Sequence, residues 1–194
     1  MLTRPILLAA LAGAVAMFFY GATEWLNPLL HAPYQLPPQV DAFNAQLAAA
    51  VPDEGIYTWP QGEHGHNPDG SISSPQYFLV KRSADYYQPG RFMAVEFVGQ
   101  LVTWGLIAFL MVRLGLRTHC ERVGLALALA GVVGLGYFLP MWNWWGFPTE
   151  YVLVRWGNLA VGWTLAGAAA SWALARARRR VPTASGSAAP VAMA

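Results

Sequence analysis

The sequence predicts an all-α membrane protein, a bundle of four transmembrane helices with a small extracytoplasmic α+β insert between the first two helices. Three observations predict this class. The 194 residues are 56% apolar and only 11% charged, whereas soluble domains carry roughly 25% charged residues. Apolar stretches recur at the length that a bilayer core requires of a helix. Basic residues also gather at one set of the stretch ends, which is typical of cytoplasmic segments.

The first predicted transmembrane helix covers residues 1–23. The small-residue motif Ala14-Val15-Ala16 would also fit the cleavage site of a signal peptide. However, the apolar run continues through Tyr20 and becomes long enough to span the membrane. We therefore expect an uncleaved anchor.

The insert, residues 24–91, predicts a short helix followed by a β-hairpin. Val40, Phe43, Leu47 and Val51 recur at the spacing of an apolar helix face. Residues 56–59 and 77–82 are rich in aromatic and branched side chains, which favours two strands. Because an isolated hairpin is marginally stable in water, we expect the insert to lean on the membrane helices or on a neighbouring subunit.

The rest of the chain alternates predicted spans with short connections. The third span carries a strip of small residues, Gly124, Ala128, Gly131 and Gly134, which predicts close packing against another helix. The predicted segments are helix two at 92–114, a cytoplasmic loop at 115–122, helix three at 123–140, an aromatic external loop at 141–150, helix four at 151–176 and a disordered cytoplasmic tail at 177–194.

The basic residues predict the orientation. With four spans, eight of the twelve fall on one side of the membrane, whereas nine of the ten acids lie on or near the other side. Such a bias near the ends of spans marks the cytoplasmic face. We expect an inner (cytoplasmic) membrane protein of a Gram-negative-like cell, with both termini cytoplasmic and residues 24–91 extracytoplasmic. The eight residues are Arg4, Arg113, Arg117, Arg122, Arg176, Arg178, Arg179 and Arg180.

A polar network is predicted inside the bundle. Glu96, Gln100 and Thr103 are spaced i, i+4 and i+7, so they share one face of the second helix. A carboxylate in lipid is costly unless it is paired, protonated or facing water. Arg155 lies at a similar depth in the fourth helix, and Asn158 lies one turn deeper. These residues predict either a buried latch between the two helices or a proton, anion or ligand site that opens outward.

Metal binding has one candidate, in the loop of the predicted hairpin. Glu63, His64 and His66 lie close together, with Asp69 nearby, and i and i+2 side chains of an extended segment point the same way. The alternative is a solvated loop without metal. No cofactor is otherwise predicted. The single cysteine, Cys120, excludes an internal disulfide.

Aromatic residues mark two further candidate surfaces for a ligand or a partner. Tryptophans favour the membrane interface, so the predicted external loop reads first as an interfacial belt and otherwise as a binding platform. Two tryptophans at i and i+7 on helix four share a face that could line a groove or face lipid. The loop residues are Trp142, Trp144, Trp145 and Phe147, and the helix residues are Trp156 and Trp163.

The layout of four spans, with a long first external loop that contains some strand and a short second one, is similar to that of claudin-type tetraspan proteins. The resemblance is one of layout. The Trp-Gly-Leu-Trp run and the paired loop cysteines of claudins are missing here. It therefore implies a topology and no barrier function.

No recognised catalytic pattern occurs in the sequence. We therefore expect a non-enzymatic accessory or scaffolding subunit of a larger membrane assembly, in contact with lipid and with a protein partner in the membrane. No basic surface for nucleic acid is predicted. The alternative is a membrane enzyme or transporter that uses an outward-facing pocket at Glu96 and Arg155 for a small amphiphile, a quinone-like ligand or a proton. A pocket lined by these residues would favour the alternative, and sealed packing around them would exclude it.

Overall fold

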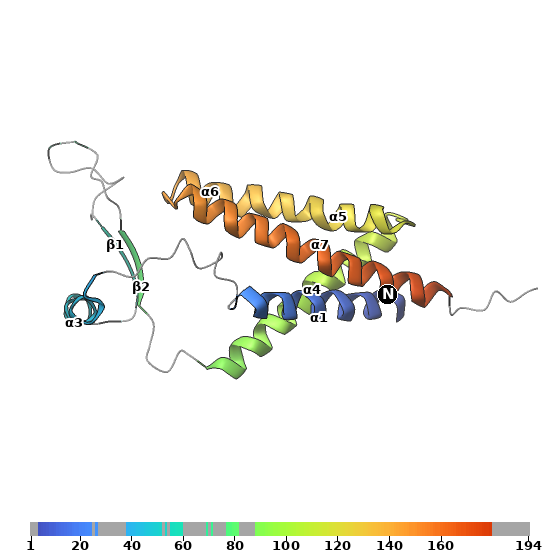
Figure 1. Ribbon diagram of the computed structural model, residues 1–194, viewed down its shortest axis with the longest axis horizontal. Helices are drawn as coiled ribbons and strands as arrows, with labels where there is room; N and C mark the ends of the chain where they lie inside the picture. The colour runs from blue at the N-terminus through green and yellow to red at the C-terminus, as the bar shows by residue number, and fades with distance from the viewer. Residues whose placement is uncertain are drawn as a thin grey trace, which may run out of the picture.

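The computed structural model describes residues 4–24, 26, 38–51, 53, 55–59, 69, 71, 77–81 and 88–179. The protein is mostly helical (Figure 1). The elements are α1 (Arg4–Glu24), α3 (Val40–Ala50), β1 (Gly55–Trp59), β2 (Tyr77–Lys81), α4 (Pro89–Arg113), α5 (His119–Val133), the π-helical turn η2 (Gly134–Phe138), α6 (Leu139–Asn143) and α7 (Thr149–Arg179).

Within the described part of the chain, three helical segments are long and apolar enough to cross a membrane: Arg4–Thr23, Pro89–Arg113 and His119–Asn143. The last of these joins α5, η2 and α6 into one helix. These segments confirm the mostly helical character that was predicted, and their length and composition are compatible with a membrane protein. The 31-residue helix α7 is not among them, because Arg155, Asn158 and many small residues dilute its apolar character.

The helices extend beyond their predicted ranges. Helix α4 starts at Pro89 and α5 starts at His119, each a few residues before the predicted boundary. Helix α7 continues to Arg179, past the predicted end at residue 176. Helical ends are set by capping as well as by apolar content, so hydropathy alone shortens them. The rest of the predicted tail, residues 180–194, lies outside the described residues.

Helix α1 is central to the packing. It runs antiparallel to α7, because Arg4 of α1 lies near Arg176 of α7 at one end and Tyr20 bonds to Asn158 at the other. Helix α4 packs on α1, α5 packs on α7, and α4 and α5 make little contact with each other. Figure 1 shows α4 crossing α1 while α5 follows α7. The bundle is therefore open between α4 and α5.

Trp104 is the wedge that joins three of these helices. Its side chain is fully buried, and a Cβ built at Gly13 of α1 would lie 2.6 Å from its ring. The far edge of the same ring reaches Gly167 of α7. The indole Nε1 has no hydrogen-bond partner among the described residues. The buried core cluster that contains Trp104 is rich in alanine: its other members are Ile6, Ala9, Ala14, Met17, Ile107, Ala108, Met111, Ala126, Ala166, Ala170, Ala173 and Leu174.

Two other aromatic side chains also pack onto glycines. Tyr20 of α1 covers Gly162 of α7, where an added Cβ would meet the ring at 2.7 Å. Trp156 of α7 covers Gly134 at the start of η2. Glycine lets a neighbouring helix come close enough for such a ring to fill the space that a side chain would occupy.

The strip of small residues predicted on the third span packs internally only at one end. Gly134 is buried, whereas Gly124 and Ala128 are exposed, and a Cβ at Gly124 would meet nothing within 4 Å. The residues of α5 that face α7 are instead Ala126 and its neighbours, since a Cβ at Gly167 would lie 2.8 Å from the Ala126 side chain. The prediction that Gly124 and Ala128 face another helix was wrong. Small residues occur on several faces of α5, and the sequence does not show which of these faces packs.

The turn between α4 and α5 is determined by local sequence. Gly115 adopts a φ of 69°, and the Leu116 N–H donates to the Met111 carbonyl at 3.1 Å, as in the common glycine-terminated helix end. Thr118 then caps α5. Its hydroxyl accepts from the Glu121 N–H, and the Glu121 carboxylate accepts from the Thr118 N–H. This reciprocal cap starts α5 before the predicted boundary.

Arg122 secures this turn to α7. Its side chain is 2% exposed, and its guanidinium donates to the carbonyls of Leu116, Arg117 and Ser171 at 3.1–3.2 Å. The Ser171 hydroxyl also bonds to His119 Nδ1 at 2.8 Å. A residue predicted to mark only the cytoplasmic loop is therefore a buried structural contact.

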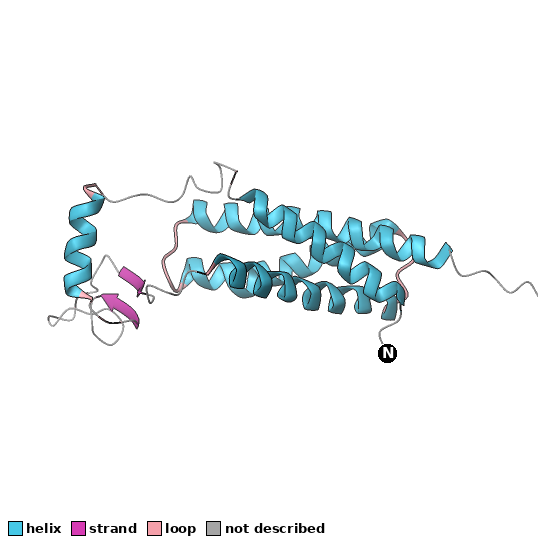
Figure 2. Cartoon of the chain, turned by 90° about the horizontal axis from the view of Figure 1, so that it is seen from below, coloured by secondary structure: helices cyan, strands magenta, loops and turns pink. Residues whose placement is uncertain are grey.

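The elements of the insert lie beyond the ends of the long helices (Figures 1 and 2). Strands β1 and β2 pair antiparallel, with Gly55 opposite Lys81 and Trp59 opposite Tyr77. Helix α3 has no buried residue, and Val51, which follows it, is 1% exposed. Val40 and Phe43 on α3 are 38% and 46% exposed, so the apolar face is open over the first part of this helix.

Candidate functional site

A pocket of about 610 Å³ opens between α1, α4 and α7. It lies at the end of the bundle where α1 ends and α4 and α7 begin, which we call the pocket end. Its polar lining consists of Glu96, Gln100 and Arg155. Pockets of several hundred Å³ that combine an apolar wall with a few polar groups are the usual form of small-molecule sites. The remaining lining residues are Met17, Phe18, Gly21, Ala22, Phe92, Met93 and Val95.

The helical repeat places the polar side chains in this pocket. Glu96 and Gln100 are one turn apart on α4, and the Gln100 amide Nε2 donates to Glu96 Oε1 at 2.7 Å. Arg155 comes from the second turn of α7 and is half-buried. An acid, an amide and a base from two helices therefore line the same pocket.

Beside the pocket, α1 and α7 are joined by a hydrogen bond that the sequence analysis did not foresee. The Tyr20 hydroxyl donates to Asn158 Oδ1 at 2.6 Å, and Asn158 is buried. The sequence does place Tyr20 near the end of one predicted span and Asn158 at a similar depth in another. This pattern predicts a hydrogen bond only once α1 and α7 are known to be neighbours.

The predicted network is only partly buried. Asn158 is buried, whereas Gln100, Thr103 and Arg155 are half-buried and Glu96 is exposed. Glu96 differs from the predicted buried network because α4 packs mainly on α1 and makes few contacts with α5 or α7. In this position the carboxylate is open to a ligand in the pocket that Glu96 lines.

The pocket lining is suited to binding or to proton exchange. Among the described lining residues, none is a serine, cysteine, histidine or lysine that could act as a nucleophile. Glu96 can accept hydrogen bonds or a proton, and Arg155 can donate to an anionic or carbonyl oxygen. The two groups together favour a ligand with a polar head and an apolar body.

The serine–histidine pair at the opposite end of the helices does not make a second candidate active site. Ser171 is hydrogen-bonded to His119 in the manner of a nucleophile and its base. However, Ser171 is fully buried, and its backbone carbonyl accepts from Arg122. The hydroxyl therefore contributes to packing and has no access to a substrate.

The predicted metal ligands Glu63, His64 and His66 lie outside the described residues. Asp69 is described, and its Oδ1 accepts from the Ser71 hydroxyl at 2.6 Å and from the Ser71 N–H at 3.0 Å. These hydrogen bonds lower the pKa of Asp69 from its ordinary value. Within the described ranges no group of three potential metal-ligating side chains is found, and the metal site stays a prediction.

The aromatic loop residues lie at the pocket end of the helices. Trp142, Trp144 and Trp145 are exposed, while Phe147 is half-buried with its ring 5.2 Å from that of Tyr151. The Trp142 indole donates to the Thr149 hydroxyl at 3.0 Å, which ties the start of the loop to the start of α7. Exposed rings at the end of a span fit an interfacial belt.

Trp156 and Trp163 were predicted on a surface for a ligand or partner, and they lie between helices instead. Trp156 packs onto Gly134. The Trp163 ring is 6.0 Å from that of Trp104 and belongs to the edge of the core. Helix α7 has neighbours on two sides, so a face that reads as exposed in isolation is covered in the folded chain.

Comparisons with protein-family models, curated proteins and solved structures found no match to this chain. The predicted likeness to the claudin layout therefore carries no function to this chain, and the chemistry of the pocket is what indicates one.

Proposed function

We propose that the chain is an inner-membrane protein with four spans, both termini in the cytoplasm and residues 24–91 outside it. Helix α7 is the fourth span in this proposal. Its 31 residues correspond to about 46 Å of helix, more than the roughly 30 Å of a bilayer core. Because α7 lies antiparallel along α1 and is covered on two sides, it can cross without an entirely apolar surface.

We further propose that the protein binds a small amphiphile in the pocket between α1, α4 and α7. The observation that supports this function is the common pocket of Glu96, Gln100 and Arg155, with apolar residues around them. The polar head of the ligand would meet these three side chains, and its apolar body would lie against residues such as Phe18 and Phe92. Binding for transport or sequestration fits the described lining better than covalent chemistry.

The test fills the pocket without disturbing the core. A Cβ added at Gly21, which lines the pocket, meets nothing within 4 Å, so Gly21→Leu adds bulk at the pocket wall without a clash at its Cβ. Gly99→Leu is the matched control, because Gly99 is equally open and lies outside the pocket lining. Small molecules are extracted from the purified full chain and its variants and compared by mass spectrometry.

We expect one amphiphilic species to accompany the wild type and Gly99→Leu and to fall at least about tenfold, or about 1.4 kcal/mol of binding, in Gly21→Leu. Glu96→Gln should also reduce it, because the charge on the head-group side of the pocket is removed. Identical extracts from the wild type and all three variants would contradict the proposal.

A second candidate function is that of an accessory subunit, and a different observation favours it. Helix α3 lies outside the candidate spans, and its apolar residues Val40 and Phe43 are 38% and 46% exposed. An exposed apolar face on a helix outside the candidate spans is the kind of surface on which a protein partner docks. Under this function, a companion protein co-purifies with the wild type and with Ala45→Ser on the opposite side of the helix, but not with Phe43→Ser.

The topology has its own test. Cys120 is exposed near the start of α5 and is the single cysteine of the chain. A membrane-impermeant maleimide applied to intact spheroplasts should leave Cys120 unlabelled. The same reagent should label a Ser71→Cys, Cys120→Ser double variant. Labelling of Cys120 in sealed cells would contradict the proposed orientation.

A further inference from the structure

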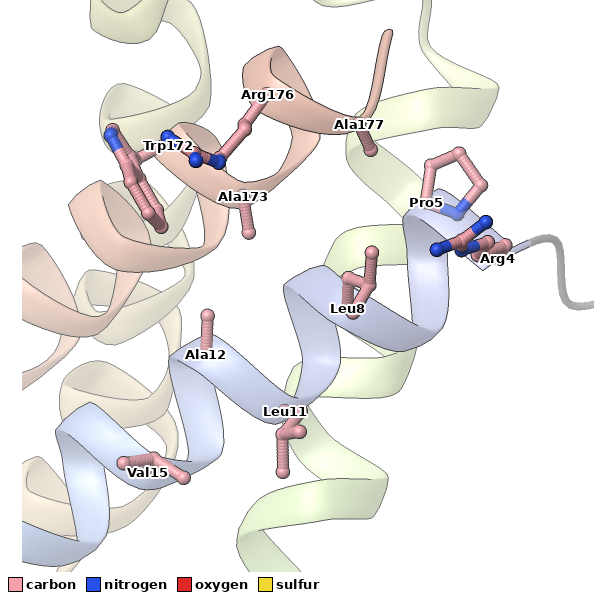
Figure 3. A pocket seen from close by; sticks show the side chains of 10 residues that line it. All are labelled: Arg4, Pro5, Leu8, Leu11, Ala12, Val15, Trp172, Ala173, Arg176 and Ala177. Atoms are coloured by element: carbon pink, nitrogen blue, oxygen red, sulfur yellow. The ribbon is translucent and has the colours of Figure 1, made fainter. Parts of the chain in front are cut away.

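A second hollow lies at the opposite end of the helices, between the start of α1 and the end of α7. This groove of about 490 Å³ is shown in Figure 3. Leu8 and Ala12 of α1 point toward Ala173 of α7 across it. The hollow exists because alanines line α7 at this level. Its full lining is Arg4, Pro5, Leu8, Leu11, Ala12, Val15, Trp172, Ala173, Arg176 and Ala177.

The charge of the groove has one sign. Arg4 comes from the first turn of α1 and Arg176 from the last turns of α7, and both side chains are exposed. The Arg176 guanidinium lies 5.5 Å from the centre of the Trp172 ring, which holds this cation at the groove. Among the described residues that line the groove there is no carboxylate. The groove therefore presents two cations without a matching anion from its own walls.

The apolar part of the groove runs along α1, in the direction that a lipid acyl chain would take if α1 crosses the membrane. Leu8, Leu11 and Val15 follow one another along α1, away from Arg4. From Arg4 to Val15 the helix rises about 16 Å, which is about half of a bilayer core. Leu8 and Leu11 are 43% and 46% exposed, so the chain leaves part of their surface for another molecule. The charged part and the apolar part thus match the two ends of a membrane lipid within one leaflet.

We propose that this groove binds one anionic phospholipid, with its phosphate between Arg4 and Arg176 and an acyl chain along α1. The inference rests on the proposed crossing of the membrane by α1 and α7, because only then does the groove begin at the lipid head groups. Arginine pairs well with phosphate through several N–H donors. Basic pockets between transmembrane helices on the cytoplasmic side are suited to anionic head groups. A single bound lipid would fill the gap between α1 and α7 at this end.

The experiment counts bound lipid on the full chain, purified and delipidated in a mild detergent. The protein is titrated with dioleoylphosphatidylglycerol, with dioleoylphosphatidylcholine and, in a separate arm, with inorganic phosphate. Native mass spectrometry reports each bound species. The variants are Arg4→Gln, Arg176→Gln and the double change. The matched control is the double change Arg113→Gln and Arg117→Gln, two exposed arginines at the same end that do not line the groove.

We expect one phosphatidylglycerol per chain, with affinity reduced about fivefold by each groove substitution and about 25-fold by both. The control should change the affinity less than twofold. Ala12→Phe, which fills the hollow and keeps both charges, should also lower the affinity for phosphatidylglycerol. Phosphatidylcholine should bind more weakly than phosphatidylglycerol, and inorganic phosphate should not be retained.

Three outcomes would overturn the proposal. If the Arg113→Gln, Arg117→Gln control loses as much affinity for phosphatidylglycerol as the groove variants, the effect is one of general surface charge. If inorganic phosphate is retained as well as phosphatidylglycerol, the groove is an anion site that does not select lipid. If the wild type is a dimer and the double groove variant is a monomer, a second copy of the chain occupies the groove. These outcomes are separable from failure of the proposed function. The maleimide reaction of Cys120 tests the topology, and Gly21→Leu tests the other pocket, which the groove variants leave intact.

Discussion

The two ends of the long helices differ in how their polar residues are used. At the basic end, where α4 turns into α5, Arg122 is buried and donates to three backbone carbonyls, including one on α7. At the pocket end, Glu96 is exposed and hydrogen-bonds to Gln100 on its own helix. One charge therefore connects elements of the fold, and the other lines a pocket.

The difference follows from which helices meet at each end. Near the basic end, Met111 and Leu174 are fully buried, and Arg122 ties the turn after α4 to Ser171 of α7. Toward the pocket end, α4 keeps α1 as its main neighbour. A small membrane protein can thus be stabilised at one end and keep space for a ligand at the other. The substitutions below test this comparison, from the largest expected effect on stability to the smallest.

Arg122→Leu should give the largest loss of stability. The carbonyls of Leu116, Arg117 and Ser171 lose their donor, and each buried unsatisfied group costs about 1–3 kcal/mol. Because part of this cost is relieved by relaxation of the turn, we expect the free energy of unfolding to fall by about 3 kcal/mol. Unfolding of the purified protein in mixed micelles measures it. Arg113→Leu, at an exposed position of the same end, is the control and should have little effect.

Gly13→Ala should give the next largest loss of stability. The added Cβ would lie 2.6 Å from the Trp104 ring, so the ring or the helix must move. Overpacking of this kind costs about 1–3 kcal/mol. The matched change Gly99→Ala meets no neighbour and should be neutral or slightly stabilising, because alanine favours the helix. If both variants unfold alike, Trp104 is not the wedge that we describe.

Tyr20→Phe removes the hydroxyl that joins α1 to α7 beside the pocket. The bond to Asn158 is 2.6 Å long, and interhelical hydrogen bonds in membrane proteins contribute about 0.6–1.7 kcal/mol. We expect a decrease within that range in the same unfolding experiment. Tyr137→Phe, at an exposed site, serves as the reference. If Tyr20→Phe is as stable as Tyr137→Phe, the hydrogen bond from Tyr20 to Asn158 does not stabilise the contact between α1 and α7.

Glu96→Gln should have the smallest effect on stability. The side chain is exposed, and glutamine keeps an oxygen that can accept from Gln100. The free energy of unfolding should stay within about 0.5 kcal/mol of wild type, as at other surface sites. Retention of the small molecule should fall, as described for the pocket. A loss of stability as large as that of Tyr20→Phe would remove the contrast between the two ends.

The sequence by itself determined the features that depend on neighbouring residues. Apolar runs of membrane length predict helices, because a backbone in lipid must satisfy its own hydrogen bonds. The turn at Gly115 and the cap made by Thr118 and Glu121 also depend on neighbouring residues alone. The predicted start of the third span at residue 123 did not take them into account. The constant rise of a helix is also what allowed Glu96 and Arg155 to be placed at a similar depth.

Only the tertiary structure decided which faces of the helices meet. The burial of Arg122, the exposure of Glu96 and the inward position of Trp163 all depend on which helix lies beside which. Helices with similar apolar surfaces can pair in several ways, and hydropathy does not distinguish them. The choice is made by shape, such as the fit of Trp104 onto Gly13, and by single bonds such as that from Tyr20 to Asn158. These join residues far apart in the chain, so no local pattern contains them.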